Sequence, residues 1–314
     1  MKIKLFLVVI SLTNFLNAQE NIDKTIYLDS LFTVTSNQNY LYYNVIKEYN
    51  LDKEIYKIEQ HYRSGKLKME VNSKYKDILT EIGISKNYYE NGVIESVKNF
   101  EKGILIGDYQ EWYENGNQKL KGIYIINNDS LDSTLKINDY WSKENIKKVI
   151  NGNGDYEENN FYNSSFGKVK NGYKEGNWEG KSEKFNYTYK ENYTDGKLTT
   201  GISIDNLGIE HIYSVIFLRP EPKNGLGSFY KYLAKKFKIP KDLEDVSGKV
   251  IVQFSIDKTG KVGDCKILKS INSSLDNEAI RLINNYPNWR IGQIRGINVK
   301  TTYAIPIVIK AEID

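Results

Sequence analysis

The sequence predicts a mainly β protein in which a run of stacked β-hairpins is followed by a C-terminal α+β domain. Three observations support this fold class. A phrase of aromatic residues around a glycine turn recurs between about residues 61 and 213. The chain has 25 tyrosines, and 21 of them precede residue 226. The last 87 residues instead follow the order helix, strand, strand, helix, strand.

The composition is that of a folded chain. A length of 314 residues suffices for about two domains, and 40% hydrophobic residues with only 5 prolines exclude extended disorder and long proline-rich spacers. The net charge is +4, and residues 226–314 hold 15 Lys plus Arg against 9 Asp plus Glu. This basicity is mild and comes without a basic helix or an RNA-binding aromatic motif, so no nucleic-acid partner is expected.

The N-terminus predicts an export signal over residues 1–18. Lys2 and Lys4 precede an apolar run over 5–16, and Ala18 is a small residue before a cleavage point that leaves Gln19 first. Twelve helical residues span roughly 18 Å, which is short of the roughly 30 Å hydrocarbon core of a membrane. We therefore expect a cleaved signal and a soluble, exported protein, with an uncleaved membrane anchor as the alternative.

Residues 61–216 are predicted to be β-hairpin repeats. The phrase occurs as HYRSGKL (61–67), YYENGVI (88–94) and WYENGNQ (112–118), with degenerate copies at 140–145 and 192–198. Ser-Gly, Asn-Gly and Asp-Gly pairs between aromatic or β-branched residues favour two-residue turns of types I′ and II′, which need positive φ. Residues 19–60, which include an aromatic stretch at 39–49, are expected to cap the N-terminal end of this sheet.

This phrase resembles the MORN repeat, in the divergent form also seen in the YwqK antitoxin-like family. The resemblance implies a structural platform and a protein or lipid contact surface, without a chemistry of its own. Periodic aromatics in a thin stack of hairpins usually form its core, so we favour that interpretation over a stripe for stacking carbohydrate or peptide.

The C-terminal domain is predicted over residues 228–314, after a breaker-rich linker at 217–227. Ser228 is expected to cap a first helix whose Phe229, Leu233 and Phe237 share a face. Strands are expected at 249–257 and 261–268 around a Thr259–Gly260 turn, a second helix at 275–286, and a last strand at 298–310. Cys265 is the only cysteine, so no internal disulfide can form, and Trp289 is expected to anchor the core.

At this point the chain resembles the C-terminal domain of the TonB family. The match is made of several separate segments in the right order within roughly residues 225–310. The segments that carry it are GKVIVQFSID (248–257), GKV (260–262), LDNEAIR (275–281), PNWRIG (287–292) and GINV (296–299), followed by Pro306 and Ile307.

The resemblance implies a TonB-type fold of two helices on a three-stranded antiparallel sheet, which binds a short peptide, the TonB box, of an outer-membrane transporter. The mode of binding is strand addition to an exposed sheet edge, which the family comparison places on the last strand. The alternatives are that this strand pairs with the same strand of a second copy, as a homodimer, or simply stays exposed. The implied partner-binding residues are Val299, Lys300, Thr301, Thr302, Tyr303 and Ala304.

The leading hypothesis is therefore a periplasmic, non-catalytic protein that binds a TonB-dependent transporter or another envelope protein. One alternative is an envelope scaffold that acts through the hairpin repeats. A second alternative is a membrane-anchored energy transducer. The transducer requires an uncleaved N-terminus and a rod across the periplasm, so a partnership with an ExbB–ExbD complex is disfavoured.

No enzyme is expected. The two histidines, His61 and His211, lie in separate β segments, and Cys265 has no histidine in its own domain, which disfavours Cys-His and zinc chemistry. The sequence has no nucleophile elbow, phosphate loop or dinucleotide fingerprint. We therefore predict no catalytic residues, no cofactor and no metal.

Overall fold

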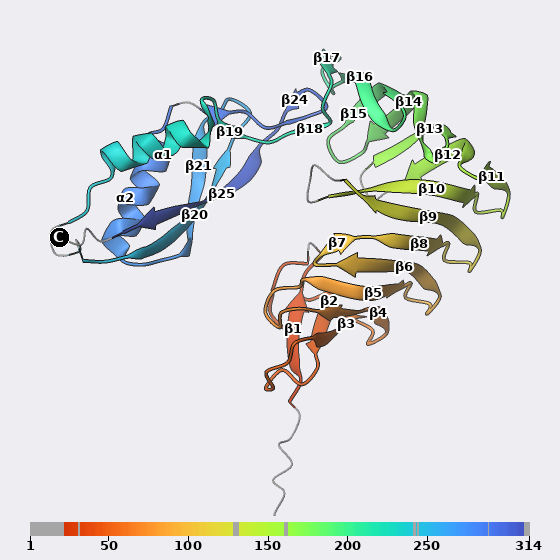
Figure 1. The fold of residues 1–314 in the computed structure, drawn as a ribbon, viewed down its shortest axis with the longest axis horizontal. Coiled ribbons are helices and arrows are strands. Elements are labelled where there is room, and N and C mark those ends of the chain that lie inside the picture. The colour runs from red at the N-terminus through yellow and green to blue at the C-terminus, as the bar shows by residue number, and fades with distance from the viewer. Residues whose placement is uncertain are drawn as a thin grey trace, which may run out of the picture. The chain divides into compact units, whose positions relative to one another are not determined.

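The computed structural model describes residues 22–30, 32–127, 132–159, 163–240, 243, 245–287 and 289–310. The predicted signal segment 1–18 lies outside these described residues. The protein is mainly β with few helices (Figure 1). It divides into two compact units, residues 1–151 and 152–314, which are described separately below.

The first unit is an antiparallel meander in which consecutive strands pair. Residues 39–49, which we expected to begin the sheet, contain β2, and β2 pairs with both β1 and β3. The strands are β1 (Lys24–Leu28), β2 (Tyr42–Ile46), β3 (Tyr56–Tyr62), β4 (Leu67–Ser73), β5 (Glu81–Tyr88), β6 (Ile94–Glu101), β7 (Ile104–Leu105), β8 (Gly107–Trp112), β9 (Gln118–Ile126), β10 (Ser133–Trp141) and β11 (Lys147–Ile150).

A ladder of tyrosine hydroxyls connects successive repeats of this unit. In each repeat the tyrosine before the turn donates its hydroxyl to a backbone carbonyl at the same place in the next repeat. The three bonds are Tyr62 to Tyr88 at 2.8 Å, Tyr89 to Trp112 at 2.9 Å and Tyr113 to Trp141 at 2.8 Å. Burial, together with nearby glutamates, raises the pKa of Tyr62 and of Tyr89 to about 12. The hydroxyls of Tyr62 and Tyr89 therefore stay protonated and can donate these bonds.

The turns of the first three repeats differ from the predicted two-residue type. The Tyr62 N–H donates to the Lys66 carbonyl at 2.9 Å, and the Gly65 N–H donates to the Tyr62 carbonyl at 2.9 Å. Only the glycine has positive φ, +87°. This is a three-residue loop in which a type I turn is followed by a left-handed glycine. The same arrangement recurs at Gly92 and Gly116, because the residue before each glycine stays at negative φ.

Two-residue turns do occur elsewhere in the repeats. In the degenerate copy at 192–198 both Asp195 and Gly196 have positive φ, +48° and +77°, as a type I′ turn requires. Thr194 and Lys197 then face each other across the hairpin. The copy at 140–145 instead keeps the three-residue loop of the first three repeats, with Asn145 at φ +63° in the place of their glycine. Asparagine tolerates this conformation better than most residues do.

The second unit begins with six antiparallel strands whose buried face is built from aromatic rings over glycines. Cross-strand neighbours pair Gly167 with Trp178, Gly180 with Tyr189 and Gly201 with Tyr213. A Cβ added to each of these glycines would lie 2.3–2.5 Å from the facing ring, so the glycines make room for the aromatics. The strands are β12 (Asn153–Asn159), β13 (Asn163–Lys170), β14 (Tyr173–Ser182), β15 (Tyr187–Thr194), β16 (Lys197–Ile204) and β17 (Glu210–Tyr213).

The C-terminal region follows the predicted order of two helices and three main strands. These elements are α1 (Gly225–Lys236), β20 (Gly248–Ile256), β21 (Val262–Lys269), α2 (Ser273–Asn284) and β25 (Thr301–Ile309), and the sheet has the order β21-β20-β25. One boundary differs. The first helix begins at Gly225 after Asn224, so Ser228 lies inside the helix and does not cap it.

Five short strands, which the sequence analysis did not predict, also form here. They are β18 (Phe217–Leu218), β19 (Glu221–Pro222), β22 (Trp289–Arg290), β23 (Gln293–Ile294) and β24 (Ile297–Asn298). Strand β18 pairs with β23, and β19 pairs with β22. The breaker-rich segment 217–227 is therefore hydrogen-bonded to the segment that follows α2.

The core of this region is apolar and aromatic, and the two helices lie on one face of the sheet (Figure 1). Trp289 is 2% exposed and lies 5.1–5.9 Å, between ring centroids, from Phe229, Phe254, Tyr286 and Tyr303. Its predicted role as a core anchor is confirmed. The second helix is capped by Asn272, whose side chain accepts a bond from the Ser274 N–H at 2.8 Å.

Candidate functional site

Strand β25 is an edge strand of the sheet β21-β20-β25. It pairs with β20 in nine consecutive positions, from Thr301 opposite Ile256 to Ile309 opposite Gly248, with no shift of register. In the part of the chain that the structure describes, no strand pairs with its other side. A regular strand with one unpaired side is a template for a further strand.

The outward peptide groups of β25 are identified by Pro306. Proline has no N–H to give to a ladder, so in a sheet it occupies a position that faces away from the neighbouring strand. The Tyr230 hydroxyl donates to the Pro306 carbonyl at 3.2 Å, as expected for an outward carbonyl. Because peptide groups alternate in direction along a strand, Thr302 and Ala304 also point outward. On the N-terminal side of Pro306 the edge therefore offers the outward N–H and carbonyl groups of two residues, Thr302 and Ala304.

Side chains alternate along the same strand. Tyr303 and Ile305 point to the core, where the Tyr303 ring lies 5.7 Å from Phe254 and burial raises its pKa. Thr302 and Ala304 are exposed. A peptide beside β25 would thus contact the backbone and exposed side chains of Thr302 and Ala304 without opening the core.

Residues just before β25 are already engaged within the domain. The buried Val299 donates its N–H to the Gly292 carbonyl at 2.9 Å. Lys300 forms an exposed ion pair with Asp264 at 2.6 Å, and Ser255 also donates to Asp264 at 2.7 Å. These bonds, that of Lys300 foremost, lower the pKa of Asp264. Of the six residues implied by the resemblance, only Thr302 and Ala304 combine an outward peptide group with an exposed side chain.

A hollow lies beside the second half of β25 and was not anticipated from the sequence. It has a volume of about 350 Å³ and is lined by Tyr230, Leu233, Ala234, Phe237, Ile239 and residues 307–310. Ile239 and Val308 are exposed. These residues come together only because α1 packs on the sheet, so no local sequence pattern indicates the hollow.

The opposite edge strand, β21, is less regular. Its pairing with β20 shifts register twice, and Asp264 within it has a positive φ of +50°. Bulges and strained residues on an edge hinder the addition of another strand. The regular edge of the sheet is therefore that of β25.

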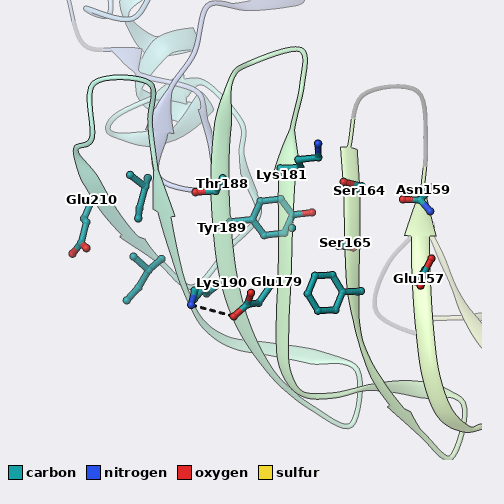
Figure 2. A pocket seen from close by; sticks show the side chains of 14 residues that line it. Glu157, Asn159, Ser164, Ser165, Glu179, Lys181, Thr188, Tyr189, Lys190 and Glu210 are labelled. Atoms are coloured by element: carbon teal, nitrogen blue, oxygen red, sulfur yellow. Dashed lines mark ion pairs between the residues drawn. The ribbon is translucent and has the colours of Figure 1, made fainter.

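A second surface feature lies on the exposed face of β12–β16 (Figure 2). It is a hollow of about 530 Å³. Its floor includes a cross-strand row in which Phe166 and Ile202 flank the Glu179–Lys190 ion pair, whose N–O distance is 3.1 Å. Phe166 is 58% exposed, unlike the other aromatics of these strands, so this face carries an uncovered apolar residue.

The residues that were weighed for catalysis have separate local partners. The His61 ring stacks on Tyr43 in the first unit. In the second unit, His211 lies 3.0 Å from Asp205. The Cys265 thiol donates to Asn284 at 3.3 Å, and burial raises its pKa. Among the described residues, no group of three or more His, Cys, Asp or Glu side chains could hold a metal ion.

Comparison with known proteins identifies the C-terminal region. Residues 242–309 match the family model of the Gram-negative bacterial TonB protein C-terminal domain. No curated protein and no solved structure gave a significant match. Within the described residues, no helix is both long and apolar enough to cross a membrane. Residues 242–309 are therefore similar to the TonB C-terminal domain, and this similarity supports a link to TonB-dependent transport in the envelope.

Proposed function

We propose that this protein is a periplasmic binding protein whose C-terminal domain takes up an extended TonB-box peptide of an outer-membrane transporter. The peptide would add as a fourth strand beside β25. The observation that carries the proposal is the regular, unpaired edge of β25 within residues that match the TonB C-terminal domain.

Two outward peptide groups give few main-chain hydrogen bonds, so the expected affinity is modest. Each such bond contributes about 0.5–1.5 kcal/mol net. The apolar hollow beside Val308 could receive one side chain of the peptide and so provide selectivity. The binding register would then be fixed by Pro306, which offers no outward N–H to the peptide.

Replacing Ala304 by proline is expected to abolish peptide binding, because proline removes an outward N–H from the edge while leaving the ladder to β20 intact. The measurement is a titration of the full chain with TonB-box peptides, followed by backbone amide shifts of Thr302 and Ala304. Ala304→Ser is the matched control, since it keeps the N–H and should still bind. Unchanged amide shifts in the original protein, or full binding by A304P, would contradict strand addition here.

A second candidate function is an envelope scaffold that acts through MORN-like hairpin repeats. The uncovered Phe166 in the hollow of β12–β16 favours it. The A304P variant separates the two functions in native cells. If an envelope protein still co-purifies with A304P, the repeats make the contact. If co-purification is lost, the β25 edge makes it.

The periplasmic location rests on cleavage after Ala18. We expect the mature protein from fractionated cells to begin at Gln19 and to be recovered with the soluble periplasmic fraction. The measurement is intact mass together with N-terminal sequencing. A membrane-bound chain that begins at Met1 would instead support an anchored energy transducer.

A further inference from the structure

The turn between β23 and β24 has an unusual residue at its tip. Arg295 and Gly296 both have positive φ, +51° and +77°, which is the geometry of a type I′ turn. Asparagine, aspartate and glycine are the residues that suit the first of these positions, whereas a long side chain is strained there. Strained backbone persists where surrounding contacts over-determine it. The contacts of Arg295 therefore call for an explanation.

The Arg295 side chain is inserted among residues of the hairpin strand β15. Its Nε donates to Glu191 Oε1 at 2.8 Å, and its guanidinium carbon lies 3.7 Å from the centre of the Tyr189 ring. Its Nη1 donates to the Tyr187 hydroxyl at 3.3 Å. The side chains of Arg295 and Glu191 are only 11% and 1% exposed. This buried ion pair, together with the stacking of the guanidinium on Tyr189, is a specific contact between the β23–β24 turn and strand β15.

Glu191 lies on the buried face of β15, and its other bonds come from the repeats. It accepts hydroxyl bonds from Tyr193 at 2.9 Å and from Tyr213 at 2.7 Å. Burial, with the bonds to Glu191, raises the pKa of both tyrosines, so both remain neutral donors. Arg295 is the only cation among the partners of Glu191 in the described residues. The repeat strands thus contain a buried carboxylate whose charge is balanced from the TonB-type domain.

Backbone contacts reinforce this junction. The Ser203 hydroxyl on β16 donates to the Arg295 carbonyl at 2.7 Å, and the Arg295 N–H donates to the Ile216 carbonyl at 2.7 Å. Next to it, a Cβ on Gly296 would lie 3.0 Å from His211 Cβ. The turn is therefore held by its side chain, its peptide groups and close packing at once.

We propose that Arg295 is a latch that fastens the C-terminal domain to the last repeat hairpins, so that β15–β17 and the sheet β21-β20-β25 move as one body. The segment 217–227 is then a fixed connection and not a hinge. The edge of β25, where the peptide is proposed to bind, then keeps a fixed orientation relative to β15–β17, whichever peptide it binds.

The test measures the spread of distances between spin labels on the two sides of the latch. Labels are attached to cysteines introduced at two exposed positions, Lys181 and Lys266, in a full-length Cys265→Ser background. Double electron–electron resonance then reports the distance distribution. We expect one narrow distribution with Arg295 present and a distribution at least twofold broader for Arg295→Ala.

Arg290→Ala is the matched control. Arg290 also pairs with a glutamate of the preceding segment, Glu221, but the two side chains are 44% and 47% exposed. Arg290→Ala should therefore leave the distance distribution between the spin labels narrow. Arg295→Lys keeps the charge but loses the fork and the stacking, so it should broaden the distribution partly, and it serves as the test if R295A does not fold. A broad distribution in the original protein, or a narrow one in folded R295A and R295K, would overturn the proposal.

Discussion

Alanine at Trp178 is expected to destabilise the strands β13–β15 by about 3–5 kcal/mol, the usual loss for a fully buried large aromatic. Trp178 has no exposed surface. Its ring lies against Gly167 and in edge-on contact with Tyr156 and Tyr193, and its Nε1 donates to the Lys168 carbonyl at 3.1 Å. Alanine would leave a cavity that the glycine opposite cannot fill.

Hydrogen exchange followed by mass spectrometry measures this effect strand by strand. We expect amides of residues 163–194 to exchange at least a hundredfold faster in Trp178→Ala, which corresponds to about 3 kcal/mol. Trp141→Ala is the control, because Trp141 is only partly buried and belongs to the first unit. Exchange rates of β13–β15 that equal those of the original protein would show that the ring does not support these strands.

Alanine at Glu191 is the second large expected effect. It removes one partner of a buried ion pair and leaves the Arg295 cation without its counter-charge, which typically costs about 3–5 kcal/mol. Two tyrosine hydroxyls also lose their acceptor. Chemical denaturation of the full chain should therefore show Glu191→Ala to be far less stable than the original protein.

An exposed ion pair between β14 and β15 provides the control. Glu179 and Lys190 are 49% and 76% exposed, so Glu179→Ala should change stability by no more than about 1 kcal/mol. In a double-mutant cycle, Glu191→Ala and Arg295→Ala together should cost clearly less than the sum of the two single changes. Additive losses would mean that the two side chains do not depend on each other.

Local sequence patterns predicted the elements well where one strand or helix faces one neighbour. The alternation in 249–257 and the helical spacing in 275–286 correspond to β20 and α2 within two residues. The aromatics of the repeats were expected in the core: Tyr140 and Tyr193 are buried, whereas those of the first three copies, such as Tyr62, Tyr89 and Trp112, are only partly buried. These patterns are local, so the residues themselves contain the signal.

Features that depend on distant segments could not be predicted in the same way. Arg295 and Glu191 are 104 positions apart, and nothing near either residue indicates the other. The turn type was misjudged because a Ser-Gly or Asn-Gly pair suits both a two-residue turn and the end of a three-residue loop. The strand register decides between them. Phe166 is exposed because the alternation of side chains along β13 places it on the outer face, although aromatic residues of the repeats were expected to be buried.

The tyrosine hydroxyl ladder of the first unit has a consequence for how such a chain can change in length. Each hydroxyl reaches only the next repeat, so a whole hairpin could be duplicated or lost without breaking any bond beyond the joint. Two strands at about 4.8 Å spacing would add roughly 10 Å per duplication. The length of this part of the protein could therefore change in evolution by whole hairpins. Insertions of other lengths would break the hydroxyl ladder.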